Sequence, residues 1–245
     1  MSRGNGKIVT NGKIPALKSI NQECNNKRQA LSQLKRLKWN LHLKNKNQEL
    51  FYDKIEKNTV TFCVGPAGCG KTYLSAYYAL KALSEKKYEH IIITKPMVEV
   101  DGEKIGYLPG NIDEKTEPYM MSIYYNMEQI IGRHRLDVLR ASGNIKVIPL
   151  AYMRGLTFND SIVILDEAQN STLGQIKTFA TRLGMRSKFI ICGDLGQSDI
   201  KGKNGLKDSV KRFIGISGVE FSKFNLDDIV RNPIVAEMLK RYEKN

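Results

Sequence analysis

The stretch GPAGCGKT, residues 65–72, decides the fold. It matches the pattern G-x-x-x-x-G-K-T, in which glycines, a lysine and a hydroxyl side chain stand at fixed positions. The β-rich run TVTFCV (59–64) leads into it, and YLSAYYALKAL (73–83), rich in helix formers and aromatic residues, follows it. A strand, a glycine-rich loop and a helix in this order predict a phosphate-binding loop.

Each residue type in this loop has a physical reason to be there. Glycines let the backbone wrap around a phosphate without Cβ clashes, and the loop N–H groups and the next helix N-terminus offer it positive partial charge. Lys71 is expected to reach the β- and γ-phosphates of ATP, and the Thr72 hydroxyl to bind Mg²⁺. A glycine-rich turn that binds nothing is the alternative, which the flanking strand and helix disfavour. The predicted nucleotide-binding residues here are Gly65, Pro66, Ala67, Gly68, Cys69, Gly70, Lys71, Thr72 and Tyr73.

Two acidic residues end a second apolar run, SIVIL (161–165). At the carboxyl end of a strand Asp166 can hold Mg²⁺, and Glu167 can polarise an attacking water, which suits hydrolysis. A strand that ends in solvated charge is the alternative. A third run, KFIIC (188–192), leads into GDLGQ (193–197), which resembles the third helicase motif. There Asp194 and Gln197 are candidates to sense the γ-phosphate or water, and a plain turn is the alternative.

Strand-like and helix-like runs alternate along the rest of the chain. This alternation predicts a doubly wound, mainly parallel α/β sheet of the P-loop NTPase class. Strands are predicted at 59–64, 91–94, 145–150, 161–165, 188–192 and 219–224, and helices at 71–83, 116–131, 133–141, 172–182 and over the last apolar residues from 234 to 242.

The positive charge is concentrated at the N-terminus. The chain of 245 residues carries a net charge of +14, and residues 1–46 hold eleven Lys and Arg against one acid, Glu23. We therefore divide the chain into a basic arm (1–46) and an ATPase domain (47–245). Leucines at 31, 34, 37 and 41 predict an amphipathic helix over 27–43 that docks on the domain. A basic arm favours a polyanionic partner, nucleic acid before a membrane surface, with a solubilising tail as the bland alternative.

Other classes of protein are disfavoured. The sequence has neither the apolar length of a membrane span nor the N-terminal apolar run of a secretory signal. Its four cysteines and three histidines lack zinc-ligand spacing. We therefore expect a cytoplasmic protein without a histidine- or cysteine-based metal site.

A series of motifs resembles the PhoH family of P-loop ATPases over about residues 47–243. Beyond the loop, it comprises ITKPMVEVDGEKIGYLPG (93–110), PLAYMRGLTFND (149–160), SIVILDEAQN (161–170), GDLGQSD (193–199) and DIVRNPIV (228–235). The resemblance implies a core like that of RecA and the superfamily 1 helicases, ATP and Mg²⁺ as cofactors, and RNA-helicase-type activity as in some members. It also implies ring-shaped, for example hexameric, assembly, and a Gln48 that reads adenine. Compact members are common in bacteriophages, so a bacterial or phage-infected cytoplasm fits.

This chain departs from the family pattern at two positions and in extent. Cys69 stands where members often have Thr or Ser, and Leu156 stands where an arginine is common, which removes a charge contact. The second domain of some relatives, such as a PIN nuclease domain, is not in this sequence.

Two functions from different classes follow. The first is a Mg²⁺-dependent ATPase coupled to binding or unwinding of single-stranded RNA or DNA in an oligomeric ring. The second is a regulatory ATP-binding protein whose nucleotide state controls assembly or a protein partner. Because a motor needs two lobes around ATP and this chain holds one, we expect a neighbouring subunit to supply the second wall and an arginine. Arg231 is the first choice and Arg182 the second, with structural ion pairs as the alternative.

Overall fold

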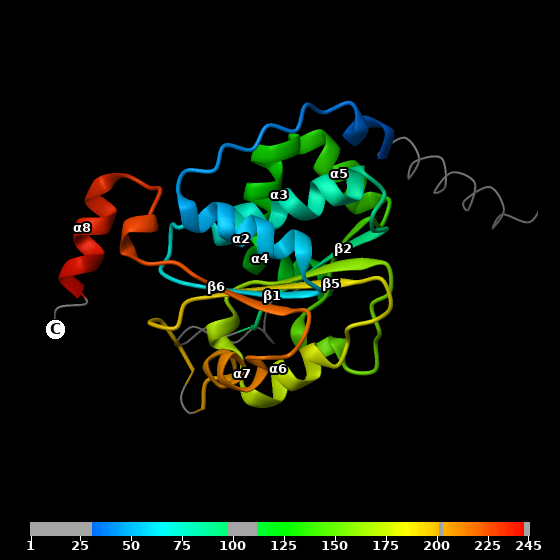
Figure 1. Ribbon diagram of the computed structural model, residues 1–245. Helices are drawn as coiled ribbons and strands as arrows, with labels where there is room; N and C mark the ends of the chain where they lie inside the picture. Colours follow the sequence, from blue (N-terminus) through cyan, green and yellow to red (C-terminus); the bar gives the residue numbers. More distant parts are fainter. Residues whose placement is uncertain (1–30, 98–111, 201–202, 243–245) are drawn as a thin grey trace, which may run out of the picture.

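The computed structural model describes residues 31–97, 112–200 and 203–242. Within these residues six parallel strands form one sheet in the order β3-β2-β4-β5-β1-β6 (Figure 1). Most of the basic arm and most of the 93–110 motif lie outside the described residues. The strands are β1 (Val60–Val64), β2 (His90–Thr94), β3 (Ile145–Val147), β4 (Ser161–Leu165), β5 (Lys188–Gly193) and β6 (Val219–Lys223).

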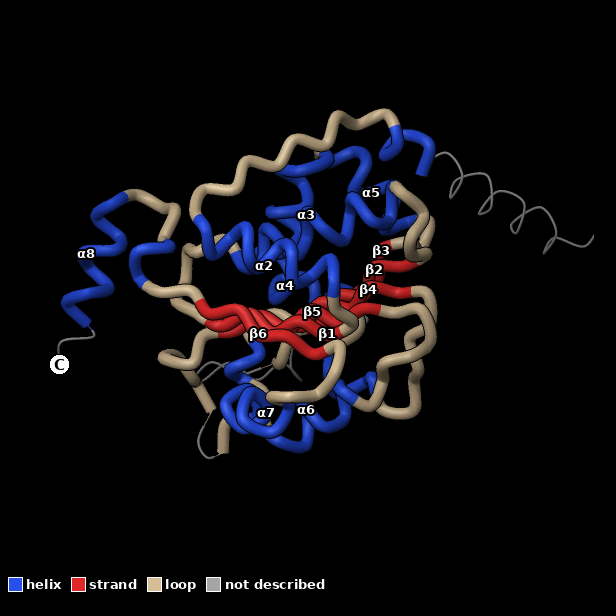
Figure 2. Tube along the Cα trace, viewed as in Figure 1, coloured by secondary structure: helices blue, strands red, loops and turns tan. Residues whose placement is uncertain are grey.

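Helices cover both faces of this sheet (Figure 2). One layer holds α2 (Lys46–Lys57), α3 (Lys71–Ser84), α4 (Ile112–Ile131) and α5 (Arg133–Ala141), and the other holds α6 (Leu173–Ala180) and α7 (Gly205–Phe213). Helix α8 (Pro233–Tyr242) contacts the short helix η4 (Leu226–Asp228) and lies away from both faces. The predicted doubly wound α/β fold is therefore confirmed.

Strand β4 shows why the sheet is buried on both sides. All five of its residues are buried, as expected of a parallel strand with helices on each face. Ile162 and Ile164 join the core beneath α3 and α4, whereas Val163 and Leu165 join the core beneath α6. The continuous apolar run that predicts this strand therefore consists of two alternating sets of side chains, and each set packs against the helices on one face of the sheet.

The strand order brings the three predicted motifs to one edge. Strand β5 lies between β1 and β4, and Val64 at the end of β1 is level with Gly193 at the end of β5. Because parallel strands end at the same edge, the P-loop after β1, the acids after β4 and Asp194 after β5 meet there.

The helix predicted over 27–43 is wrong in its second half. Residues 31–35 are helical, but residues 38–44 form neither helix nor strand. From Leu37 to Lys44 partly buried and exposed residues alternate strictly, which is the pattern of an extended chain. Trp39 packs edge-on against Tyr77 of α3 at 5.5 Å between ring centroids, and Leu34 is fully buried. The expected docking through leucines is present, with a period of two beyond Leu37.

Lys188 is a buried lysine at the start of β5. Its ammonium donates to the carbonyls of Ile55 and Asn58 at the C-terminal end of α2, where the helix dipole favours a cation. Burial lowers the pKa of Lys188 to about 8. The start of β5 is therefore tied to the last turn of α2.

None of the helices in the described part of the chain is long and apolar enough to cross a membrane.

Candidate nucleotide-binding site

The loop between β1 and α3 depends on two glycines in the left-handed region. Gly68 has φ +88° and Gly70, the N-cap of α3, has φ +86°. Both conformations are strained for a residue with a Cβ. A Cβ on Gly68 would also lie 2.9 Å from Cδ of Arg231. The glycines therefore fix the loop's curvature and allow a distant side chain to approach it.

Lys71 and Thr72 begin α3 and point in different directions. The Lys71 ammonium donates to the carbonyls of Gly65 and Pro66, at 2.7 and 2.8 Å, and so lies across the loop. The Thr72 hydroxyl donates to Oδ1 of Asp166 at 3.0 Å. The loop lysine and the acid after β4 therefore belong to one site, with Thr72 as the bridge.

Asp166 is a buried carboxyl group with 5 % exposure. Burial, and after it the neighbouring Glu167 carboxylate, raise the pKa of Asp166 above its ordinary value. Lys95 and the Thr72 hydroxyl act in the opposite direction without cancelling the rise. A bound cation would favour the ionised form.

Gln169 orients the Glu167 side chain. It is not among the site residues that the sequence predicts. Glu167 adopts φ +52°, an uncommon conformation for a residue with a Cβ. Its Oε2 accepts a 2.5 Å hydrogen bond from Nε2 of Gln169, whose Oε1 accepts from the Asp194 backbone N–H at 2.9 Å. Gln169 thus ties the acid after β4 to the loop after β5. Its place in the DEAQN motif was the available signal.

A cleft of about 330 Å³ opens between these elements. It is bounded by the P-loop, by the ends of β4 and β5, by α4 and by the segment before α8. Its lining includes Ala67, Gly68, Gly70, Lys71, Thr72, Tyr73, Ser122, Asn126, Asp166, Glu167, Gly193, Asp194, Gln197, Val230 and Arg231.

A family model described as "PhoH-like protein" matches residues 40–243. This chain belongs to the PhoH family. A PhoH-like protein of Bacillus subtilis is 42 % identical over 206 residues, which are 83 % of this chain and 64 % of that protein. Protein PhoH of Escherichia coli K12 is 39 % identical over 203 residues, which are 81 % of this chain and 57 % of that protein. The chain therefore spans about six-tenths of these relatives' length.

A solved structure shows the same fold. The large terminase from a thermophilic bacteriophage aligns with a TM-score of 0.54 at 12 % sequence identity, over 82 % of this chain and 50 % of that chain. At this identity the likeness concerns the fold alone. The PhoH chain described here is accordingly a P-loop NTPase by fold.

Most of the predicted site residues come together in the cleft. The loop residues from Ala67 to Tyr73 that line it join Asp166, Glu167 and Gln197. Pro66 contributes its carbonyl to Lys71 and to the Cys69 thiol. Cys69 itself is buried, and burial raises the pKa of its thiol to about 11.

Gln48 makes a different contact from the one expected. Its Nε2 donates to the Cys69 carbonyl at 3.0 Å, and its Oε1 accepts from the Lys44 backbone N–H at 2.8 Å. The side chain is buried, and both ends of its amide are used within the chain. In this structure Gln48 supports the P-loop from the side of α2, and its reading of adenine stays a prediction.

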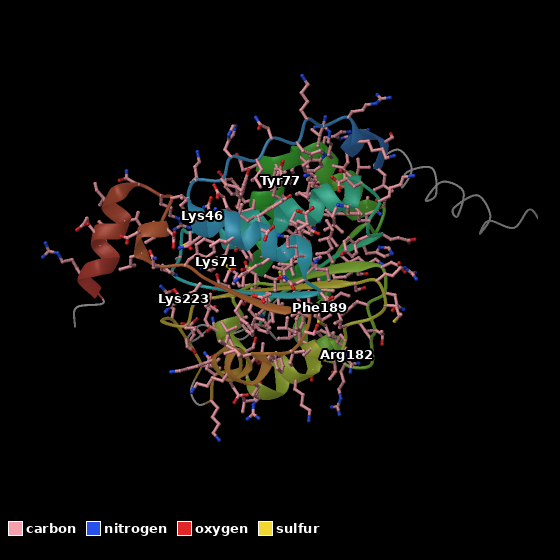
Figure 3. All side chains as sticks on the ribbon, in the orientation of Figure 1. Lys46, Lys71, Tyr77, Arg182, Phe189 and Lys223 are labelled. Atoms are coloured by element: carbon pink, nitrogen blue, oxygen red, sulfur yellow. The ribbon has the colours of Figure 1, made fainter. Side chains whose placement is uncertain are left out.

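The two candidate arginines lie at opposite ends of the strands. Arg231 lines the cleft of its own chain, because the Val230 backbone N–H donates to the Gly68 carbonyl at 3.1 Å and keeps this segment on the P-loop. Arg182 lies far from Lys71 (Figure 3) and donates to the carbonyls of Leu156 and Thr178. The structure thus places Arg231 beside the P-loop of its own chain, whereas the sequence predicts that it serves a neighbouring subunit.

Proposed function

We propose that this PhoH chain binds ATP with Mg²⁺ and hydrolyses it. The observation that carries the proposal is the 3.0 Å hydrogen bond between Thr72 Oγ1 and Asp166 Oδ1, in the cleft that also holds Lys71 and Glu167. These are the positions of a phosphate-binding lysine, a metal-binding hydroxyl and acid, and a water-activating carboxylate in P-loop NTPases.

The donor set suits Mg²⁺. This ion prefers oxygen ligands, and in NTPase sites it is held by one or two protein groups together with substrate phosphates and water. Thr72 and Asp166 would supply the protein ligands. No group of three or more His, Cys, Asp or Glu in the described ranges could hold a metal by itself. When bound, Mg²⁺ would neutralise charge on the β- and γ-phosphate oxygens.

The chain's own groups then divide the work. The Lys71 ammonium exchanges the Gly65 and Pro66 carbonyls for phosphate oxygens. Glu167, oriented by Gln169, accepts a proton from the attacking water. Arg231 offers its guanidinium to the γ-phosphate from the same chain, as an arginine in cis does in some NTPases. Gln197 is exposed and lines the cleft, and it would sense the γ-phosphate or the attacking water.

Removal of the loop lysine tests nucleotide binding. We expect Lys71→Ala to weaken ATP binding about 10- to 100-fold, because a charge-assisted contact is worth roughly 1.5–3 kcal/mol, and to abolish turnover. Titration with a fluorescent ATP analogue and a phosphate-release assay measure the two effects. Lys81→Ala, at a half-buried position in the last turn of the same helix, is the matched control. Unchanged ATP binding by Lys71→Ala would refute this site.

We further propose that hydrolysis is coupled to single-stranded RNA or DNA, in a homo-oligomer and in the cytoplasm. The concentration of positive charge in residues 1–46 supports a polyanionic partner. The residues that the structure describes form one lobe beside the cleft; a neighbouring subunit would supply the second wall, and a ring, for example a hexamer, would repeat that contact. If no RNA or DNA stimulates the ATPase at low salt, the regulatory ATP-binding function is favoured.

Deletion of residues 1–30 tests the arm without touching the buried Leu34. It removes six Lys and Arg and one Glu. We expect weaker binding to single-stranded RNA and DNA of any sequence, and a slope of log K against log salt that is flatter by about 0.7 for each lost phosphate contact. Fluorescence anisotropy at several salt concentrations measures both. An unchanged slope would assign the arm to another role.

A further inference from the structure

The residues between β6 and α8 form an outer wall for the P-loop. This 225–231 segment contains η4 and ends at Arg231. Besides the hydrogen bond from Val230 to Gly68, the Asn225 carbonyl lies 3.8 Å from the Cys69 thiol. A Cβ on Gly68 would clash with the Arg231 side chain. The segment therefore touches the phosphate-binding loop at both of its ends.

Asp228 is the buried centre of this segment, with 5 % exposure. Its Oδ2 accepts two hydrogen bonds of 2.8 Å, one from the Asn225 backbone N–H and one from Nδ2 of Asn47. The first bond closes the turn of η4 on itself. The second joins the segment to the first turn of α2, and Nδ2 of Asn45 adds a longer bond to the Asp228 carbonyl at 3.4 Å.

The same turn of α2 also holds the P-loop. Gln48, next to Asn47, donates to the Cys69 carbonyl. Asn47 and Gln48, in the first turn of α2, thus bind the 225–231 segment and the P-loop respectively. If the side-chain bonds of Asp228 were lost, the P-loop would keep its support through Gln48, while the 225–231 segment would lose its shortest bond to α2 and keep only the longer one from Asn45 and its contacts with the P-loop.

We propose that Asp228 is a positioning residue for the nucleotide site, which holds Arg231 over Gly68 through the 225–231 segment. This inference rests on the proposed ATP site. Asp228 is not among the residues that line the cleft, so its effect on the nucleotide would pass through Arg231.

The test compares Asp228→Ala with the isosteric Asp228→Asn. The alanine loses the acceptor, whereas the asparagine keeps one side-chain oxygen that can take both bonds. We expect Asp228→Ala to weaken the binding of a non-hydrolysable ATP analogue about tenfold, because the charge-assisted contact of Arg231 with the γ-phosphate would be lost. The effect on ADP, which has no γ-phosphate, should be smaller. Asp228→Asn should restore binding to within about twofold of the wild type. Asn47→Ala removes only the hydrogen-bond donor to Asp228 and replaces Asp228→Ala in the test if that variant does not fold. Thermal unfolding shows whether each variant is folded.

A double variant separates positioning from general damage. If Asp228 acts through Arg231, then Asp228→Ala adds no further loss of affinity to Arg231→Ala. A full additional tenfold loss in the double variant would overturn the proposal, as would wild-type affinity in both Asp228→Ala and Asn47→Ala. Failure of the wild-type chain to bind ATP at all would instead refute the proposed function.

Discussion

Glu167→Gln is expected to lower kcat for ATP hydrolysis by about 10²- to 10⁴-fold, the usual contribution of a general base. Glutamine has nearly the same shape and can keep the hydrogen bond with Gln169, but it cannot accept the proton of the attacking water. ATP binding should therefore stay within about twofold of the wild type. Single-turnover hydrolysis with excess enzyme measures the chemical step, and analogue titration measures binding.

Glu56→Gln, an exposed change on α2, is the matched control and should hydrolyse ATP normally. Wild-type turnover in Glu167→Gln would mean that the base lies elsewhere. A loss of binding and turnover together would mean that Glu167 shapes the cleft and does not activate water. Asp166→Asn does not test the base, because it changes the proposed metal ligand.

Arg231→Ala is expected to lower kcat by about 10³- to 10⁵-fold, the range for an arginine that stabilises the γ-phosphate in the transition state. Its place against Gly68 of the same chain also predicts the outcome of a mixing experiment. If Arg231 acts within its own chain, each active chain needs its own Lys71 and its own Arg231. Mixed oligomers of Arg231→Ala and Lys71→Ala should therefore remain inactive. Arg212→Ala, on the exposed side of α7, is the control.

Recovery of ATPase activity in that mixture would show that Arg231 reaches a neighbour's nucleotide, as the sequence alone suggested. The same mixture made with Arg182→Ala tests the other candidate. Arg182 lies at the opposite end of the strands, so it can reach a nucleotide only across a subunit contact. Mass measurement of the mixed species shows whether hetero-oligomers have formed.

Local motifs were sufficient to predict the parts of the site that one strand and its loop provide. The GPAGCGKT loop fixes its own curvature through Gly68 and Gly70. The acids after SIVIL were placed correctly because a strand buried on both faces has to end where its sequence turns polar. The same reasoning located α3, β4 and β5 to within one or two residues.

Contacts between distant segments could not be predicted. Gln48 and Cys69 are 21 residues apart, and Arg231 meets Gly68 only because β6 returns beside β1. Helix α7 is absent from the predicted helices although Leu206, Val210 and Phe213 recur at helical spacing and pack against the core; its nine residues give this period over only about two turns. Leu37 and Leu41 fit a helical period by themselves, whereas Trp39 and Leu43 between and after them give the period of two that the structure shows.

Helix α2 connects the P-loop with the start of β5. Its 12 residues, at about 1.5 Å each, make a rod of about 18 Å. Near the N-terminus of the helix, Gln48 donates a hydrogen bond to the P-loop. At its C-terminal end, the carbonyls of Ile55 and Asn58 accept hydrogen bonds from Lys188 at the start of β5. If nucleotide binding moves the P-loop, a tilt of this rod would reach the start of β5, at the end of the strands where Arg182 lies. If a second subunit packs against that end of the strands, its contact would change when the nucleotide binds.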